Sequence, residues 1–269
     1  VELDEGFVVK VNQTTMIMIE SMDDDMFNYF AGLFQKTFWE NDAFKVKDPN
    51  YELVTIPLGA LVRHDQSISL NLVKLLIYNI KTQIERGAGS IRSYSEIHQR
   101  DVKLVLYLTA MNDVLRQAHA KILEISTELT EFIIYVYDNI SNPPLDVLNS
   151  ILVHSILSSL TSTEITRCSL FSEENDILPQ EKWGGLQNDI RLYAPENLNF
   201  KWHIPTKEEV SFAVSFFDNI SDYCIEKITT LISKPSNDKA YTDLIQKYVL
   251  VLTHALSGSS LLFDPDFNK

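Results

Sequence analysis

The side chains that could carry out chemistry in this sequence are few, and their spacing fits no familiar catalytic site. A thiol, Cys168, follows an imidazole, His154, in an apolar and helical context. A cysteine protease also needs an Asn or Asp that orients the histidine, and none stands at a recognisable position. A packed histidine and a buried thiol explain this pair better than a nucleophile and its base. We therefore predict that the chain is not an enzyme.

Patterns that bind metals, phosphates or cofactors are also missing from the sequence. The six histidines never occur with the H-x-x-x-H or H-E-x-x-H spacing of a helical zinc site. The run 87–90 (GAGS) lacks the lysine of a phosphate-binding loop, so Gly87 is expected to end a helix. Asp23, Asp24 and Asp25 lack the alternating oxygens of a calcium loop and are expected to start a helix. We predict neither a cofactor nor a metal.

The charge of the chain limits its partners. Its formal net charge of −14 argues against direct binding to nucleic acid or to an anionic membrane, since both need clustered Lys and Arg. A protein with basic patches would be attracted instead. No apolar run reaches the roughly 18–20 residues of a membrane span.

The cysteines and the chain ends suggest where this sequence belongs. Cys168 and Cys224 show no C-x-x-C spacing, which favours a reducing, intracellular compartment. The sequence begins at Val1 without an initiator Met and reaches Lys269 without a closing element. We expect an internal piece of a longer protein.

Helical periodicity is the strongest signal along the chain. Apolar residues recur at spacings of three and four, for example Phe27, Phe30 and Phe34, which places them on one face of a helix. The predicted helices cover about residues 22–38, 67–86, 95–117, 119–138, 145–161, 206–233 and 238–256. The helix from Thr206 carries a capping box, with Thr206 as N-cap, Glu209 three residues later and Pro205 just before.

Two stretches break this pattern. Residues 41–66 and 172–205 contain Pro and Gly residues and lack helical periodicity, and the second is long for a connection inside a compact domain. The best candidate strand is Tyr51–Ile56.

Helices joined in pairs, several of them apolar around much of their circumference, predict an all-α fold. The preferred architecture is an α-solenoid of HEAT/armadillo-like helix hairpins, because both neighbours in a stack cover each hairpin. We expect helical repeats over 1–171, an irregular Trp-, Pro- and Gly-containing connection over 172–205, and helical repeats over 206–269. A globular all-α bundle is the alternative.

The second irregular stretch and the helix after it resemble a known family. The resemblance is carried by residues 182–184 (KWG), 201–205 (KWHIP), 206–213 (TKEEVSFA) and 254–262 (HALSGSSLL). This pattern resembles the large HEAT-repeat proteasome activators, the ATP-independent bleomycin-sensitivity class also called the two-hundred-kilodalton activator. The run from Trp202 to Ala213 is uncommon in composition and therefore specific. Over residues 1–170 the match is in helical character and short fragments.

The resemblance implies a segment of a dome that caps the α-subunit ring of the proteasome core particle. It implies gate opening for peptides and unfolded proteins without ATP, links to proteasome assembly and DNA repair, and residence in nucleus and cytoplasm. The family's gate-engaging tail ends in a hydrophobic residue, Tyr and one further residue, whereas this chain ends Phe267-Asn268-Lys269. The acetyl-lysine-reading region of the family is not visible either, so no functional residue of the family can be carried over.

The motif residues are therefore expected to be structural. Large amphipathic tryptophans can pin a long connection to a helical surface, and a proline fixes the entry into the next helix. The residues concerned are Trp183, Gly184, Trp202, His203, Pro205, Thr206 and Glu209. A second functional hypothesis is a HEAT-repeat transport or chromatin scaffold whose acidic face grips a basic protein.

Overall fold

The computed structural model of the chain describes residues 14–15, 18–19, 22–40, 51–88, 101–169 and 199–263. The chain divides into two compact units. One unit contains the residues up to Ser162 and those from Pro205 onward, and the other is Thr163–Ile204.

Helices form the first unit, and most of them follow the predicted boundaries to within a few residues. They are α2 (Asp24–Glu40), α3 (Tyr51–His64), η1 (Gln66–Ile68), α4 (Ser69–Glu85), α5 (Val102–Ala118), η3 (His119–Ile125), α6 (Ser126–Asn139), α7 (Pro143–Thr161), α9 (Lys207–Ile232), α10 (Lys239–Gly258) and η6 (Ser260–Phe263). The predicted helix over 95–117 is confirmed from Val102, and residues 95–100 lie outside the described part of the chain.

Local sequence signals set several of these boundaries. Gly87 adopts a left-handed φ of 83° after α4, and its N–H donates to the carbonyl of Ile84 at 2.8 Å. The N–H of Ala88 donates to the carbonyl of Gln83 at 3.1 Å, which completes the two hydrogen bonds of a Schellman cap. The prediction that Gly87 ends a helix is confirmed. At a helix start, Pro143 is the first residue of α7, where a backbone N–H would have no partner within the helix and its absence therefore loses no hydrogen bond.

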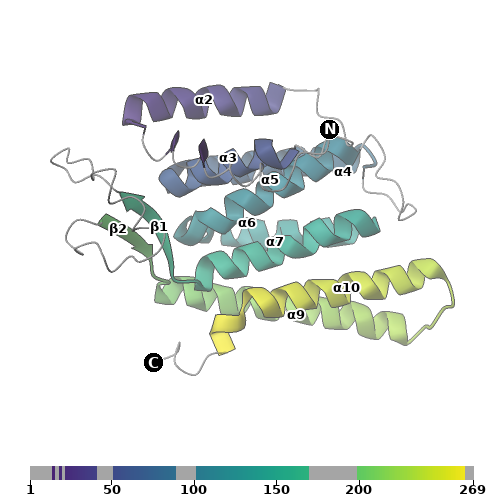
Figure 1. Ribbon diagram of the computed structural model, residues 1–269. Coiled ribbons are helices and arrows are strands. Elements are labelled where there is room, and N and C mark those ends of the chain that lie inside the picture. Colours follow the sequence, from purple (N-terminus) through teal and green to yellow (C-terminus); the bar gives the residue numbers. More distant parts are fainter. Residues whose placement is uncertain are drawn as a thin grey trace. The chain divides into compact units, whose positions relative to one another are not determined.

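The helices of the first unit pack in two layers. In one layer α3, α5, α7 and α10 lie side by side in that order, and in the other α4, α6 and α9 follow one another (Figure 1). The chain alternates between the layers, and helices consecutive in the chain pack on each other across them as the hairpins α4–α5, α6–α7 and α9–α10. Hairpins added in sequence order are the arrangement of an α-solenoid, so the predicted all-α HEAT-type fold is confirmed.

The core of this unit runs between the two layers. It extends without a break from α3 to α10, and the large side chains Phe132, Tyr137 and Phe216 are fully buried in it. Burying an apolar side chain of this size contributes about 1.5–3 kcal/mol. A smaller cluster that includes Phe27, Ala31 and Leu61 joins α2 to α3. Hydrophobic burial therefore holds each helix to its neighbours in the stack.

A buried polar contact links α5 and α7 within one layer. The side-chain amide of Asn112 donates to the carbonyl of Leu148 at 3.2 Å, and the hydroxyl of Ser155 donates to Asn112 Oδ1 at 3.1 Å. Sliding one helix along the other would leave these buried groups unpaired, which costs about 1–3 kcal/mol each. This contact therefore favours one register of the two helices.

The second unit contains a two-stranded antiparallel sheet. Strand β1 (Glu164–Ser169) pairs with β2 (Asn199–His203), with Glu164 opposite His203 and Cys168 opposite Phe200. The register is irregular between Ile165 and Arg167. In sequence this unit is inserted between α7 and α9, which pack directly against each other.

The structure corrects the predicted strand at Tyr51–Ile56, because these residues begin helix α3. The β-branched residues Val54, Thr55 and Ile56 favour a strand locally. Helix wins because Leu58, Leu61 and Val62 continue a spacing of three and four, and all three are completely buried. Pro57 is accommodated inside the helix at the cost of one backbone hydrogen bond.

One further prediction, that of a continuous helix over 119–138, needs correction. The helix expected over 119–138 begins as the 3-10 segment η3 and becomes α-helical only at Ser126. The break follows from His119, whose φ of 43° is rare for a side chain other than glycine. The N–H of His119 donates to Ser159 Oγ at 2.8 Å. The stretch expected to be irregular, 172–205, contains β2, and its residues 172–198 lie outside the described part.

Over the described residues, no helix is long and apolar enough to cross a membrane.

Candidate functional site

The predicted capping box at the start of α9 is present in the structure. The N–H of Glu209 donates to Thr206 Oγ1 at 3.2 Å, and the N–H of Thr206 donates to Glu209 Oε2 at 2.8 Å. The carboxylate of Glu209 is buried, whereas Thr206 is exposed. Pro205 directly precedes the box and begins the helical unit. These three residues therefore fix where α9 starts, which is a structural task.

The other motif residues lie in the second unit or outside the described part of the chain. Trp202 and His203 belong to β2, where Trp202 is opposite Ile165 and His203 is opposite Glu164. Trp183 and Gly184 lie outside the described residues. Whether the tryptophans pin the connection to a helical surface stays a prediction.

The most unusual polar group of the helical unit is the buried Lys247 of α10, which belongs to none of the sequence motifs. Its side chain is 3% exposed and donates hydrogen bonds to the backbone carbonyls of Tyr137 and Ile140 at the end of α6. The last carbonyls of a helix lack partners within the helix and carry partial negative charge, so a buried ammonium stabilises that end. Burial lowers the pKa of Lys247, and the carboxylates of Asp146 and Asp138 partly offset this effect.

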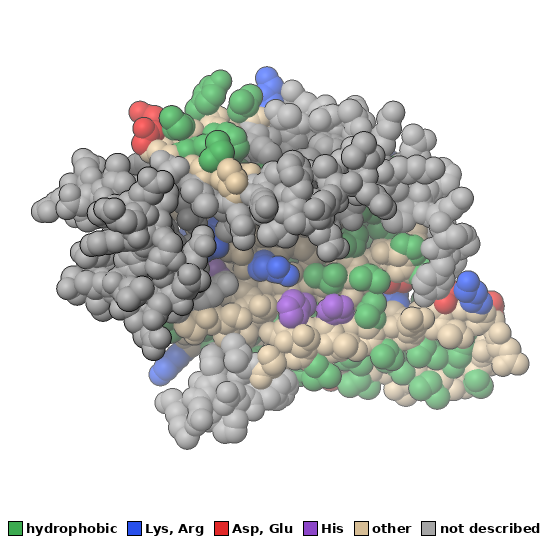
Figure 2. Space-filling view, viewed as in Figure 1, with side chains coloured by type: hydrophobic (Ala, Val, Ile, Leu, Met, Phe, Trp, Pro, Cys, Tyr) green, Lys and Arg blue, Asp and Glu red, His purple; other side chains and the backbone are tan. Residues whose placement is uncertain are grey.

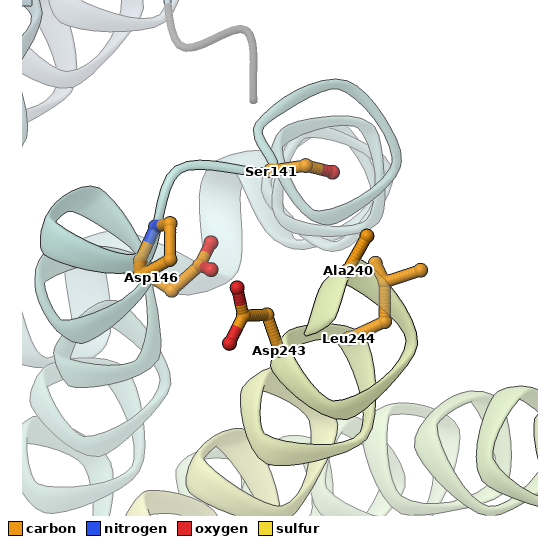
Figure 3. A pocket seen from close by; sticks show the side chains of 6 residues that line it. Ser141, Asp146, Ala240, Asp243 and Leu244 are labelled. Atoms are coloured by element: carbon orange, nitrogen blue, oxygen red, sulfur yellow. The ribbon is translucent and has the colours of Figure 1, made fainter. Parts of the chain in front are cut away.

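Asp146, in the first turn of α7, is the second buried charge at this corner. It is 6% exposed, and burial raises its pKa to about 7 although the ammonium of Lys247 acts in the opposite direction. The carboxylate of Asp243 on α10 raises the pKa of Asp146 further. Figure 3 shows the two carboxylates facing each other across a small pocket. The pocket is lined by Ser141, Pro143, Asp146, Ala240, Asp243 and Leu244.

A more exposed polar group surrounds Asp138 at the end of α6. Asp138 Oδ1 accepts hydrogen bonds from Tyr223 Oη at 2.7 Å and from Lys227 Nζ at 2.9 Å, both on α9. Burial acts to raise the pKa of Asp138, but these two hydrogen bonds and the charge of Lys227 lower it overall. Tyr223 also packs edge-on against Tyr248 of α10, with ring centroids 6.0 Å apart. The end of α6 is thus bonded to both helices that follow α7.

The sequence carried one signal that could have identified this corner. Lys247 lies on the same stripe of α10 as the buried Tyr248, Val251 and Ala255, so its position alone predicts burial. Its partners on α6 are more than a hundred residues away in sequence, and no local pattern could have named them.

His154, considered above as a catalytic base, lies against another histidine. His154 packs edge-on against His254 of α10, with ring centroids 6.2 Å apart, and burial lowers the pKa of both imidazoles. Cys224 is a buried free thiol whose pKa burial raises to about 12, so it is protonated at neutral pH. Of Cys168 the structure describes only the backbone in β1. Among the described residues, no group of three or more His, Cys, Asp or Glu is arranged to hold a metal ion.

The surface of α9 and α10 carries exposed apolar side chains. Figure 2 shows them gathered along the edge of the helical unit where these two helices lie. The large ones are Val214, Ile225 and Ile232 on α9 and Val249 and Leu256 on α10. An exposed apolar patch of this kind is typical of a surface that contacts protein.

Comparison with known proteins identifies the family of this helical stack. Residues 1–263 match the family described as proteasome activator complex subunit 4, mid HEAT repeats region. The chain belongs to this family. The resemblance inferred from residues 182–213 and 254–262 is thereby confirmed, and so is the assignment as an internal segment of a proteasome activator.

A member of the family from yeast is closely similar to this chain. Proteasome activator BLM10 of Saccharomyces cerevisiae is 59% identical over 269 residues. The match covers 100% of this chain and 13% of BLM10. The chain therefore corresponds to a small part of that relative.

Proposed function

We propose that the chain is a segment of a proteasome activator that caps the end of the proteasome core particle, contacts its α-subunit ring and opens its gate. In this role the parent protein promotes ATP-independent degradation of peptides and unfolded proteins. The observation that carries the proposal is the 59% identity over the whole chain to a protein named proteasome activator BLM10.

The structure supports a role through shape and contact area rather than through bond chemistry. The helices form two layers, and the buried ammonium of Lys247 serves helix packing by donating to the carbonyls at the end of α6. The one thiol whose surroundings are described, Cys224, is buried and protonated. We therefore infer that the segment is not an enzyme and needs no cofactor.

The apolar edge supports packing against further repeats of the parent protein. The exposed side chains of α9 and α10 lie on the last described hairpin layer, where a solenoid adds its next unit. Because the chain corresponds to 13% of BLM10, the parent protein has ample sequence for such repeats.

Native gel electrophoresis of the full-length parent protein with purified core particles tests the proposal. We expect a complex that migrates more slowly than the core particle and that hydrolyses a fluorogenic peptide faster in the absence of ATP. Core particles alone and core particles with an unrelated acidic protein of similar size are the controls. A folded full-length protein that neither co-migrates nor increases hydrolysis would overturn the proposal.

We further propose links to proteasome assembly and DNA repair, and residence in nucleus and cytoplasm. These rest on the resemblance to the bleomycin-sensitivity class. Cells that lack the parent gene should be more sensitive to bleomycin and accumulate unfinished core particles, and the intact gene should restore both. A fluorescent fusion should be found in both compartments.

The net charge of −14 favours a second candidate, a transport or chromatin scaffold that grips a basic protein. Binding to a basic peptide that weakens steeply with salt, together with no effect on the proteasome, would favour this alternative.

A further inference from the structure

The small pocket between α7 and α10 has polar groups that the helix packing does not use. Asp146 and Asp243 face each other across it, and Ser141, in the turn before α7, also lines it (Figure 3). The cavity measures about 20 Å³, which is room for one water-sized group.

Asp146 has a buried carboxylate oxygen that a ligand could bind. It is 6% exposed, and its Oδ1 is buried without a hydrogen-bond partner among the described residues. An unpaired buried carboxylate oxygen is destabilising, and native structures rarely tolerate one. The nearest cation is Lys247, but its ammonium donates to the carbonyls of Tyr137 and Ile140 instead. A donor from outside the helical unit would satisfy Asp146.

The local charge indicates what that donor carries. With both carboxylates ionised, Asp146, Asp243 and the ammonium of Lys247 leave one negative charge at the corner. A ligand with a single positive charge neutralises it, whereas a divalent metal would leave an excess positive charge beside a buried ammonium.

The shape of the pocket selects among singly charged groups. A primary ammonium has three N–H donors and is about the size of a water molecule, so it can donate to both carboxylates. A guanidinium is a planar group with five donors and is too large for this cavity. Pro143, Ala240 and Leu244 form apolar walls that fit the methylene stem of a lysine.

We propose that this pocket binds the ammonium group of a lysine side chain presented by a partner protein. The proposal does not rest on the proposed proteasome function, and either can fail without the other. Both charged residues come from the ends of helices that the stack holds rigidly, so the site is formed before the lysine arrives.

Hydrogen exchange measured by mass spectrometry on the full-length parent protein tests the site. The probe is n-butylammonium chloride, which reproduces the end of a lysine side chain. The starts of α7 and α10 should exchange more slowly, with opening reduced by the factor 1 + [L]/Kd, about fivefold at a probe concentration of about four times Kd. Tetramethylammonium chloride at the same concentration is the control for ionic strength, because it has the charge but no N–H donor.

Variants locate the effect. Asp243→Asn removes one charged acceptor at a partly exposed position and should weaken the probe about tenfold in Kd. Asp222→Asn makes the same change of charge on the exposed surface of α9 and should leave protection unchanged. Asp146→Asn should abolish protection, and Asp243→Asn keeps the test decisive if that variant folds poorly.

The pH dependence of the protection provides an independent test of the site. The groups that act on Asp146 are Asp243 and Lys247 of α10, and Tyr137 of α6 is influenced by Asp146 in return. Because the pKa of Asp146 is about 7, a proton competes with the probe below that pH. Protection relative to the probe-free protein should therefore be larger at pH 8 than at pH 6.

Three results would overturn the proposal. Equal protection by tetramethylammonium would show a general salt effect. Stronger protection by calcium chloride at matched ionic strength would assign the pocket to a metal ion. Protection that survives in both Asp146→Asn and Asp243→Asn would place the probe elsewhere.

Discussion

The buried carboxyl of Asp146 shows how one residue can tie stability to pH. Its pKa is raised from the ordinary 3.8 to about 7, so the folded protein binds this proton more tightly than the unfolded chain does. The stabilisation of the folded state by this proton is fully present below pH 3.8. It falls as the pH rises from 3.8 to about 7 and does not change further above that pH.

We expect Asp146→Asn to remove this pH dependence. Relative to the natural protein, local stability of the α7 start should increase by an amount that grows from pH 5 to pH 8 and reaches the order of a few kcal/mol. The attraction of Lys247 for the ionised carboxylate is already included in the pKa of Asp146, so it limits the gain at pH 8 and has no effect at pH 5, where the carboxyl is neutral. Hydrogen exchange of Asp146→Asn and of the natural protein at pH 5 and pH 8 measures this gain in stability. A gain that is the same at both pH values would contradict the raised pKa of Asp146.

At the same scale, the residues that were predicted from sequence are those whose partners are local. Thr206 and Glu209 lie three residues apart, and the capping box followed from that spacing alone. Lys247 and Asp146 were missed because their roles depend on carbonyls and charges that only folding brings near.

Among the elements, the start of α9 offers a direct test of the capping box. We expect Thr206→Ala to cost about 1 kcal/mol, because the N–H of Glu209 loses its acceptor. Hydrogen exchange in the first turns of α9 is the measurement. Lys207→Ala is the matched control, since Lys207 is an exposed first-turn residue outside the box. Equal effects of the two variants would mean that the box does not stabilise the helix.

The close packing of α10 on α7 depends on the absence of a side chain at Gly258. A Cβ there would lie 2.8 Å from the carbonyl oxygen and 2.9 Å from the Cα of His154. Gly258→Ala should therefore push the end of α10 away from α7 and lower the free energy of unfolding by about 1–3 kcal/mol.

Gly32, in α2, provides the opposite case. A Cβ at this position meets nothing within 4 Å, so Gly32→Ala should stabilise α2 by up to about 1 kcal/mol. Thermal unfolding of both variants against the natural protein measures the contrast. A Gly258→Ala variant as stable as the natural protein would contradict the close contact.

Elements with long amphipathic patterns could be predicted from the sequence, and short or irregular ones could not. The helices α4, α9 and α10 have apolar stripes over several turns, and α7 is apolar around most of its circumference. The start of α3 has β-branched or aromatic residues at four of its first six positions, which favours a strand, and only the buried positions after Pro57 reveal the helix. The turn at His119 needs the hydroxyl of Ser159, forty residues away.

For the molecule as a whole, the insertion between α7 and α9 should be separable from the stack. These two helices pack directly on each other, and α7 ends on the side of the stack where α9 begins (Figure 1). We expect that replacing residues 164–203 with a flexible linker of about ten residues preserves the helical unit. Shortening the loop about fourfold lowers the cost of closing it by about 1 kcal/mol.

Hydrogen exchange in α7 and α9 of the shortened parent protein checks this expectation. Protection should be unchanged or slightly greater than in the natural protein. Faster exchange through both helices would show that the second unit is required to hold the hairpin together.

The order of the helices has a mechanical consequence. Since extensive contacts join mainly helices that are close in sequence, tension applied at the two ends would peel hairpins away one after another instead of breaking the stack at once. Each released hairpin lengthens the chain by a fixed step and can snap back without rearranging the others. The segment would therefore behave as a spring that yields and recoils in increments.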